Sequence, residues 1–179
     1  MARRSRDKGA RFERFVASAF AARFNRKIRR VPLSGGLDIK CDLYDPENDD
    51  FPFFIECKYR ESYRWSTLWD HGSPLFDVFL RTQKQASESY LKEKYIGGPH
   101  PLVVFKGGDF NAPMVMFTVD AFCSFFTDAA ALSVCLRVNH GNRALRIALL
   151  HEFLDKVRVS NLRERPKNTT TAQEDDGEY

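Results

Sequence analysis

The chain has 179 residues, 43% of them apolar, which is enough to bury the core of one domain. No run of about 18 apolar residues is present, and no apolar segment follows the arginine-rich N-terminus, so the sequence predicts neither a membrane span nor a secretory signal. The net charge of +4 is uneven: residues 1–31 carry eleven Lys/Arg against two acidic residues, a net of +9, and the rest of the chain carries −5. A basic N-terminal third favours a polyanionic partner such as nucleic acid, although a solubilising charged face would have the same composition.

The four cysteines indicate a reducing compartment. None belongs to a C-x-x-C pair, and Cys41 and Cys57 fall on apolar faces of predicted strands. Buried, reduced thiols in a cytoplasmic protein are therefore expected, rather than a zinc site or a disulfide framework.

The first predicted element is an amphipathic helix from about Lys8 to Phe24, preceded by a flexible basic arm at residues 1–8. Its apolar stripe has members three and four residues apart: Phe12, Phe15, Val16, Ala19, Phe20 and Phe24. Glu13 lies at the margin of this stripe. It is either an ordinary boundary charge or a group that reaches into a site beneath the helix.

A basic segment containing Arg29 and Arg30 leads into the loop Ser34-Gly-Gly36. Paired glycines allow backbone N–H groups to converge on a phosphate, but they serve equally well to turn the chain between a helix and a strand.

Residues 38–44 and 51–59 flank an acidic turn, so they are predicted to form an antiparallel hairpin. Side chains alternate along a strand, which puts Asp38 and Asp42 on the face opposite to the apolar residues. Pairing the apolar faces brings these aspartates to the side of Glu56. Residue 56 can pair with residue 42 or with residue 38, and in both registers the apolar side chains stay on one face. The alternation therefore leaves both aspartates as candidates.

The second strand of this hairpin carries the most suggestive residues. Phe54, Glu56 and Lys58 share one face, while Phe53, Ile55 and Cys57 share the other. A carboxylate two residues before a lysine can hold a divalent cation next to an amine that orients a water molecule. A Glu-x-Lys tripeptide by itself is also what a solvated strand edge looks like.

The segment after Lys58 contains the aromatic residues Tyr63, Trp65 and Trp69 together with the basic residues Arg60 and Arg64. These rings could contact DNA, or complete the core or a dimer contact. A second helix is predicted from Pro74 to about Tyr95, with Gln85 beside its apolar stripe. The other predicted elements are strands at 101–106 and 114–119, a short helix from 120 to about 131, a hairpin at 133–138 and 144–149, and an amphipathic piece at 151–157. Residues 1–160 then form a single domain, and residues 161–179 an acidic tail that is expected to be disordered.

This order of elements predicts an α/β fold in which helices flank a mixed central β-sheet. Together with the helix motif Lys8-Gly-Ala-Arg11-Phe-Glu13-Arg14, the Arg30 to Ser34 spacing, and Glu56-Cys57-Lys58, it resembles the PD-(D/E)XK nuclease superfamily. The archaeal-type Holliday junction resolvases and their phage-borne relatives look most similar. The resemblance covers roughly residues 8–120 and implies a restriction-endonuclease-like core.

The resemblance also implies roles. Asp42 or Asp38, together with Glu56 and the backbone carbonyl of Cys57, would bind Mg²⁺, with Mn²⁺ as a substitute, because hard oxygen ligands suit a hard cation. Lys58 would orient a water molecule, and Glu13 would contact the metal through water or bind a second ion. The remaining candidates are a glutamine on the second helix, Gln85, and the DNA-contacting residues Lys8, Arg11, Arg14, Arg29, Arg30, Ser34 and Arg60.

The implied function is a Holliday junction resolvase, a metal-dependent DNA endonuclease that acts as a homodimer because a four-way junction needs two matched cuts. No small-molecule cofactor and no membrane partner are expected. The place of action would be the cytoplasm of a prokaryotic cell, with a phage gene as one source of the protein. An exonuclease or restriction-like endonuclease of the same superfamily is the alternative, and a non-catalytic DNA-binding protein is a third interpretation.

Overall fold

The computed structural model describes residues 2–31, 40–47, 51–68, 73–89, 99–126, 132–133, 135–140 and 143–158. Its centre is a mixed sheet with the strand order β1-β2-β3-β4-β5-β7-β6 in the described part of the chain. The strands are β1 (Arg29–Arg30), β2 (Leu43–Tyr44), β3 (Phe53–Tyr59), β4 (His100–Gly107), β5 (Phe110–Thr118), β6 (Cys135–His140) and β7 (Arg143–Leu149). Only β3 and β4 pair in parallel among the described strands; the other pairs are antiparallel.

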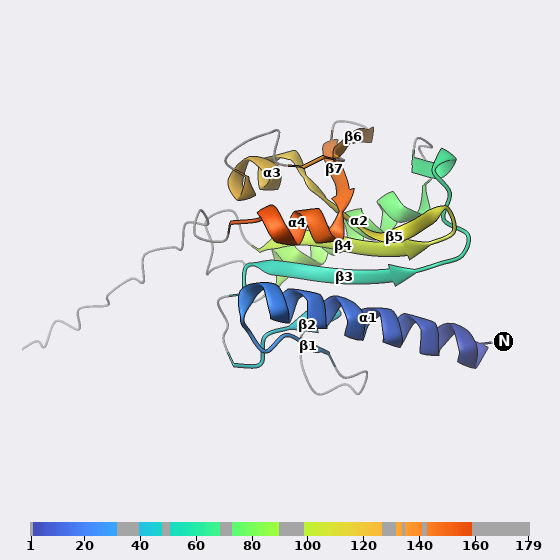
Figure 1. Cartoon of the computed structure of the whole chain (residues 1–179). Helices are drawn as coiled ribbons and strands as arrows, with labels where there is room; N and C mark the ends of the chain where they lie inside the picture. The colour runs from blue at the N-terminus through green and yellow to red at the C-terminus, as the bar shows by residue number, and fades with distance from the viewer. Residues whose placement is uncertain are drawn as a thin grey trace, which may run out of the picture.

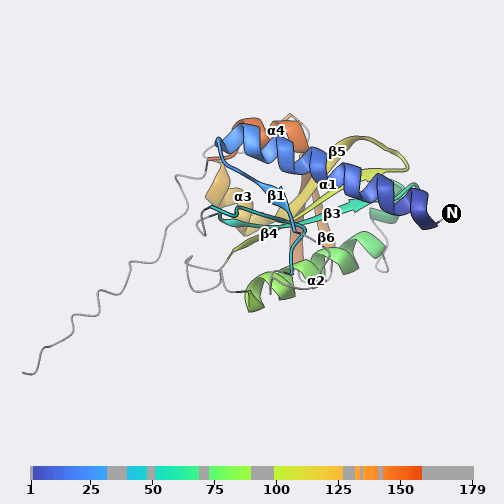
Figure 2. The ribbon, with the colours of Figure 1, turned by 90° about the horizontal axis from the view of Figure 1, so that it is seen from below.

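Helices cover both faces of this sheet, as the sequence predicts. They are α1 (Ala2–Phe24), α2 (Pro74–Glu88), α3 (Val119–Phe125) and α4 (Leu150–Lys156), with a short 3₁₀ helix at Ser66–Leu68. The turned view shows α2 on one side of the sheet and α1 with α4 on the other (Figure 2). One core cluster joins α1, α3 and α4 to the sheet, and another joins α2 to the opposite face. None of the described helices is both long and apolar enough to span a membrane.

The arrangement of α1 over β3 positions the candidate site. Helix α1 runs along β3 in the opposite direction (Figure 1), so that Phe20 contacts Phe51 and Phe53 near the start of the strand. Near the end of the strand, the ring of Phe12 contacts the ring of Tyr59, with centroids 6.1 Å apart. The N-terminal half of α1 therefore lies over the carboxyl end of β3.

Two expectations about α1 were wrong. The helix begins at Ala2 rather than at about Lys8, because residues 2–8 contain neither Gly nor Pro and are mostly good helix formers; the expected flexible arm is part of the helix. Phe15 was assigned to the buried stripe, but its side chain is 53% exposed. Phe12, Val16 and Phe20 are buried, and Phe15 stands about 100° around the helix from Val16.

The structure confirms the strands predicted at 51–59, 101–106, 114–119, 133–138 and 144–149 in position, shortens the one predicted at 38–44 to Leu43–Tyr44 within the described residues, and adds a strand. Two-residue β1 pairs with β2 through Arg29↔Tyr44 and Arg30↔Leu43. Helix α2 connects the parallel strands β3 and β4, which is the usual way to join parallel neighbours. It buries the predicted residues Leu75, Val78, Phe79, Thr82 and Ala86, and also Phe76. The predicted end of this helix, residues 127–131 of the third helix and the C-terminal tail lie outside the described residues.

The β4–β5 turn shows why glycine is needed there. Gly107 and Gly108 have φ values of 109° and 61°, in the left-handed region. A Cβ atom on Gly108 would lie 1.8 Å from the backbone oxygen of Tyr63, so the turn is packed directly against the segment that follows β3.

Candidate active site

The pairing of β2 with β3 brings Asp42 to the strand that carries Glu56. Leu43 pairs with Ile55, and the N–H of Asp42 also donates to the carbonyl of Ile55, at 2.9 Å. Asp42 therefore lies against Ile55, the residue before Glu56. The Leu43↔Ile55 register agrees with the pairing of residues 42 and 56, one of the two that the sequence left open. Asp38, the other candidate, lies outside the described residues.

A hydrogen bond fixes the Asp42 carboxylate against β3. The backbone N–H of Cys57 donates to Asp42 Oδ2 at 2.7 Å. The Cys57 side chain is buried in the core beneath α1, and its thiol is free. Asp42 is thus tied to the strand that carries Glu56 and Lys58.

Glu56 and Lys58 share a face of β3, as predicted, and form an ion pair between Glu56 Oε1 and Lys58 Nζ. Their side chains are 17% and 26% exposed, so both are largely withdrawn from water. Phe54, two residues earlier on the same face, is buried in a small cluster with Cys41 and Ala86. This cluster packs α2 below the site.

Glu13 reaches the same region from α1. Its carboxylate pairs with the guanidinium of Arg30 on β1, and the two side chains are 18% and 27% exposed. Glu13 is therefore part-buried and paired across two elements, α1 and β1.

The carboxylates are close enough to perturb one another. Burial, and then the charge of Glu56, raise the pKa of Asp42 from 3.8 to about 6, against the opposing effects of the Cys57 N–H bond and Lys58. Burial raises the pKa of the Cys57 thiol well above its usual value, with further contributions from Asp42, Glu13 and Glu56, so this thiol stays neutral. Burial alone would lower the pKa of Lys58, but the hydrogen bond and charge of Glu56 outweigh it, and the pKa is raised.

This donor set suits a hard divalent cation. Three carboxylates share the region with two cations, and within the described residues Asp42 has no ion-pair partner of its own. Oxygen ligands of this kind are what Mg²⁺ and Mn²⁺ prefer. The described residues contain no group of three or more His, Cys, Asp or Glu side chains arranged to hold a metal. The expected set is smaller, two carboxylates and a backbone carbonyl.

The other candidate residues are spread more widely. Arg14, Arg29 and Arg60 are exposed, whereas Lys8 forms an ion pair with Glu61. Arg11 lines a cavity on the far flank of α1 from Glu13. Gln85 is part-buried on α2 beside Ala86, and Ser34 lies outside the described residues.

Tyr63, which the sequence named as a candidate for a DNA, core or dimer contact, is a neighbour of the site. Its ring packs edge-on against Phe105, which is the register partner of Lys58 on β4. Its hydroxyl is buried and has no hydrogen-bond partner among the described residues, and burial raises the pKa of the phenol. An aromatic residue soon after Glu-x-Lys was visible in the sequence, but its position next to Lys58 depends on β4.

Comparison with known proteins agrees with this architecture. A search of curated proteins and a search of solved structures found no match. The family model described as "Phage putative PDDEXK endonuclease" matches residues 4–129, which include α1, the β1–β3 region, α2, β4 and β5. The match covers more than half of the chain and contains every element of the site. The chain therefore belongs to this phage endonuclease family, within the PD-(D/E)XK nuclease superfamily, and has a restriction-endonuclease-like fold.

Proposed function

We propose that this protein is a divalent-metal-dependent DNA endonuclease that hydrolyses phosphodiester bonds. The observation that carries the proposal is the hydrogen bond from the Cys57 N–H to the Asp42 carboxylate, which fixes Asp42 to the strand on which Glu56 and Lys58 form an ion pair. The arrangement joins oxygen ligands from two neighbouring strands with an amine beside them. Family membership supports the same class of reaction.

Asp42, Glu56 and the carbonyl of Cys57 would hold Mg²⁺, or Mn²⁺ in its place. Such an ion polarises a phosphodiester and lowers the pKa of a bound water molecule. Lys58 orients the attacking water and offsets the negative charge that develops on phosphorus. Glu13, held by Arg30, contacts the ion through water or binds a second one.

Basic residues around the site hold the DNA backbone. Arg14 and Arg29 are exposed on α1 and β1, the two elements that also supply Glu13 and Arg30. Guanidinium groups bind phosphate oxygens in pairs of hydrogen bonds, so these residues are suited to contacts with non-bridging oxygens. Ser34, Lys8, Arg11 and Arg60 extend this set, and Gln85 on α2 is a further candidate catalytic residue.

The finer proposal is a Holliday junction resolvase that works as a homodimer on branched DNA in the cytoplasm of a prokaryotic host. Two identical sites related by a two-fold axis match the two cuts that a four-way junction requires. The support is the Lys8-Gly and Glu13-Arg14 pattern of α1 and the Arg30 partner of Glu13.

Cleavage assays test both the proposed endonuclease activity and the finer proposal of a junction resolvase. Purified protein with Mg²⁺ is incubated with a four-way junction, a linear duplex and a single strand of the same sequence. Symmetric nicks near the branch point support junction resolution. Internal cuts in the linear duplex indicate an endonuclease that is not specific for junctions. Shortening of the duplex from its ends indicates an exonuclease. The absence of any metal-dependent cleavage would overturn the proposal.

Two variants connect the cleavage to the site. Glu56→Gln should abolish cutting while DNA binding is kept, because a metal ligand is lost and negative charge near the phosphates is reduced. Lys58→Met should lower the rate about 100-fold or more. Glu88→Gln and Lys84→Met are matched controls, since these residues form an exposed ion pair on α2. A non-catalytic DNA-binding protein predicts no difference between the site variants and the controls.

A further inference from the structure

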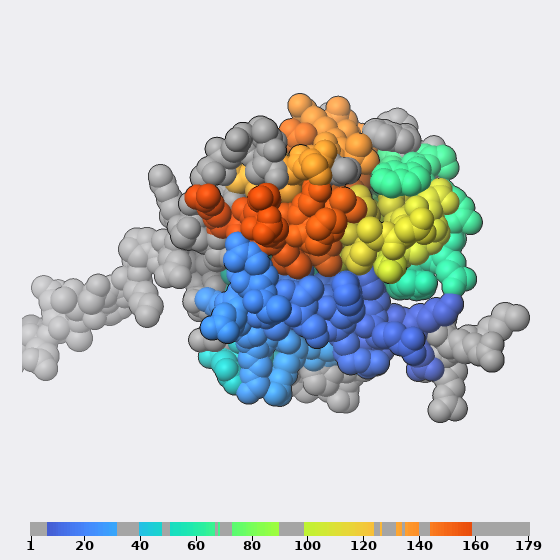
Figure 3. All heavy atoms as spheres, in the orientation of Figure 1, coloured from blue at the N-terminus to red at the C-terminus, as the bar shows by residue number. Residues whose placement is uncertain are grey.

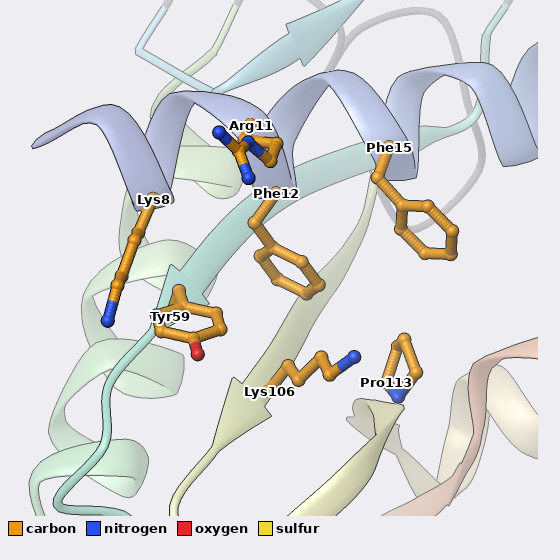
Figure 4. Close-up of a pocket in the computed structure, with 7 residues that line it drawn as sticks. All are labelled: Lys8, Arg11, Phe12, Phe15, Tyr59, Lys106 and Pro113. Carbon is orange, nitrogen blue, oxygen red and sulfur yellow. The ribbon is translucent and has the colours of Figure 1, made fainter. Parts of the chain in front are cut away.

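A cavity of about 350 Å³ lies on the flank of α1 that faces β4 and β5 (Figure 4). Helix α1 supplies one wall, the end of β3 the floor, and β4 and β5 the other side. The lining residues are Lys8, Arg11, Phe12, Phe15, Tyr59, Lys106 and Pro113. None of them is among the proposed metal ligands, so this is a second feature of the molecule.

The apolar part of the lining consists of aromatic rings. Phe12 and Phe15 lie with centroids 6.4 Å apart and planes inclined by 13°, and Phe12 meets Tyr59 edge-on. Phe15 is 53% exposed, and the only other exposed large apolar side chain among the described residues is Trp65, at 40%. The close-up shows the Phe15 ring at the rim, beside Phe12 and above Pro113. Exposed rings of this kind are stacking surfaces for nucleobases.

The polar part of the lining is positively charged. Lys8 pairs with Glu61, but Arg11 and Lys106 have no carboxylate partner within the described residues. Two cations without counter-charge at the mouth of an aromatic cavity favour a ligand that is both flat and anionic. A nucleotide meets both requirements, whereas an apolar peptide or a second copy of this surface would leave the cations unmatched.

The cavity is next to the candidate active site along two elements. Tyr59 directly follows Lys58 on β3, and Phe12 directly precedes Glu13 on α1. Side chains of neighbouring strand residues leave opposite faces of the sheet, so the cavity opens on the α1 side and Lys58 lies on the α2 side. A path between them passes around the carboxyl end of β3. A duplex is too stiff for such a turn over a few nucleotides, and a single strand is flexible enough.

A second hollow extends this path. It has a volume of about 620 Å³ and shares Tyr59 and Lys106 with the first cavity. Its walls include Gly107 and Gly108 in the tight β4–β5 turn, and Arg64, which pairs with Asp109. Lys106 therefore stands between two adjoining depressions at the same end of the sheet. The space-filling view shows α1, α4 and the β5 region meeting on this face of the molecule (Figure 3).

We propose that this cavity binds one unpaired nucleotide of the DNA strand. The base packs against Phe15 and Phe12, and the phosphate lies between Arg11 and Lys106. This inference rests on the proposed function in one respect, that the ligand is DNA. It adds that the enzyme requires an unpaired position next to the bond that it cuts, which a branched or frayed substrate offers and a continuous duplex does not.

The test measures binding without cleavage. A twelve-nucleotide single strand carrying 2-aminopurine is titrated with protein in EDTA, and a blunt duplex of the same sequence is titrated in parallel. Phe15→Tyr keeps the ring, and Phe15→Leu removes it while keeping an apolar side chain. We expect Phe15→Leu to weaken single-strand binding about 5-fold or more and to reduce 2-aminopurine quenching, since stacking on one ring contributes at least this much. Phe15→Tyr should bind like the wild type, and the duplex affinity should not change.

A comparison of two lysine variants completes the design. Lys106→Met should weaken single-strand binding, whereas Lys84→Met on the exposed face of α2 should not. Equal binding by Phe15→Leu and the wild type would overturn the proposal. So would an equal loss for single strand and duplex, or a loss of dimers in sedimentation experiments with DNA binding intact, which would make the patch a contact between copies. Because these assays contain no metal, they stay informative if the protein fails to cut DNA, and the cleavage assay stays informative if the cavity binds nothing.

Discussion

Replacing Asp42 by Asn should make the metal-free protein more stable at neutral pH. The folded chain holds the Asp42 proton more tightly than the unfolded chain, because the pKa is about 6 rather than 3.8. Protonation of Asp42 therefore stabilises the folded state. Its contribution to the free energy of unfolding is fully present below pH 3.8 and is lost as the pH rises through 6. At pH 7.5 the ionised carboxylate costs about 3 kcal/mol, since one pKa unit corresponds to about 1.4 kcal/mol.

Asn removes this charge and keeps an oxygen that can accept the Cys57 N–H bond. We expect the free energy of unfolding in urea to rise by about 2–3 kcal/mol at pH 7.5, and the difference from the wild type to vanish at pH 4. Mn²⁺ should stabilise the wild type but not the variant, because ligands that bind only the folded state raise its stability. The predicted stabilisation is the opposite of what most substitutions of part-buried residues produce.

Asp45 provides the matched control. Its side chain is fully buried, pairs with Arg26 at 3.5 Å and accepts the N–H of Glu47. Removal of this paired charge in Asp45→Asn should lower stability at pH 7.5. If Asp42→Asn is destabilised like Asp45→Asn, or if its stability gain persists at pH 4, then repulsion around Asp42 is not the cause, and the assignment of this carboxylate to a cation site loses its physical basis.

Three further predictions concern stability. Burial lowers the pKa of His100 from 6.5 to about 4, so the neutral imidazole contributes fully to the free energy of unfolding above pH 6.5. About 3 kcal/mol of this free energy is lost as the pH falls through 4. His100→Gln should make the stability measured by urea unfolding less dependent on pH in this range. Tyr63→Phe removes a buried hydroxyl that has no hydrogen-bond partner in the part of the chain that the structure describes, so thermal unfolding should show unchanged or increased stability, by up to about 1 kcal/mol. Gly108→Ala should cost about 2 kcal/mol or more, because the new Cβ meets the backbone of Tyr63 at positive φ, whereas Gly9→Ala, in open space on α1, should stabilise the protein by up to about 1 kcal/mol.

The alternation of side chains was enough to predict the pairing of β2 with β3 and the two faces of β3, but not the face of Cys41, which packs with Phe54 rather than with Leu43. It identified Cys57 as buried and Glu56 and Lys58 as neighbours on the other face. It did not determine the register, because a shift by an even number of residues keeps every side chain on its face. The structure specifies the pair Leu43↔Ile55, and the N–H of Cys57 bonds the carboxylate of Asp42.

Features that depend on distant segments could not be predicted in this way. Spacings of three and four residues are both compatible with a helical stripe, so Phe15 was placed in the core with Phe12. Its exposure becomes meaningful only next to Lys106 and Pro113, which β4 and β5 bring to α1 from about a hundred residues away. Strand β1 was missed because two arginines have no strand pattern of their own and pair only when β2 is present.

The charges of the candidate site explain why a divalent cation, rather than a third basic residue, would complete it. Lys58 and Arg30 balance Glu56 and Glu13, which leaves the ionised Asp42 as one uncompensated negative charge in a part-buried region. A lysine or arginine there would bring the region to neutrality and give a phosphodiester nothing to bind. A divalent ion instead converts the deficit into one net positive charge, which equals the single negative charge of a phosphodiester. The raised pKa of Asp42 then reflects the free energy needed to keep this carboxylate ionised before the metal ion binds. A proton competes with the metal ion for the carboxylate, and the ion has to displace it.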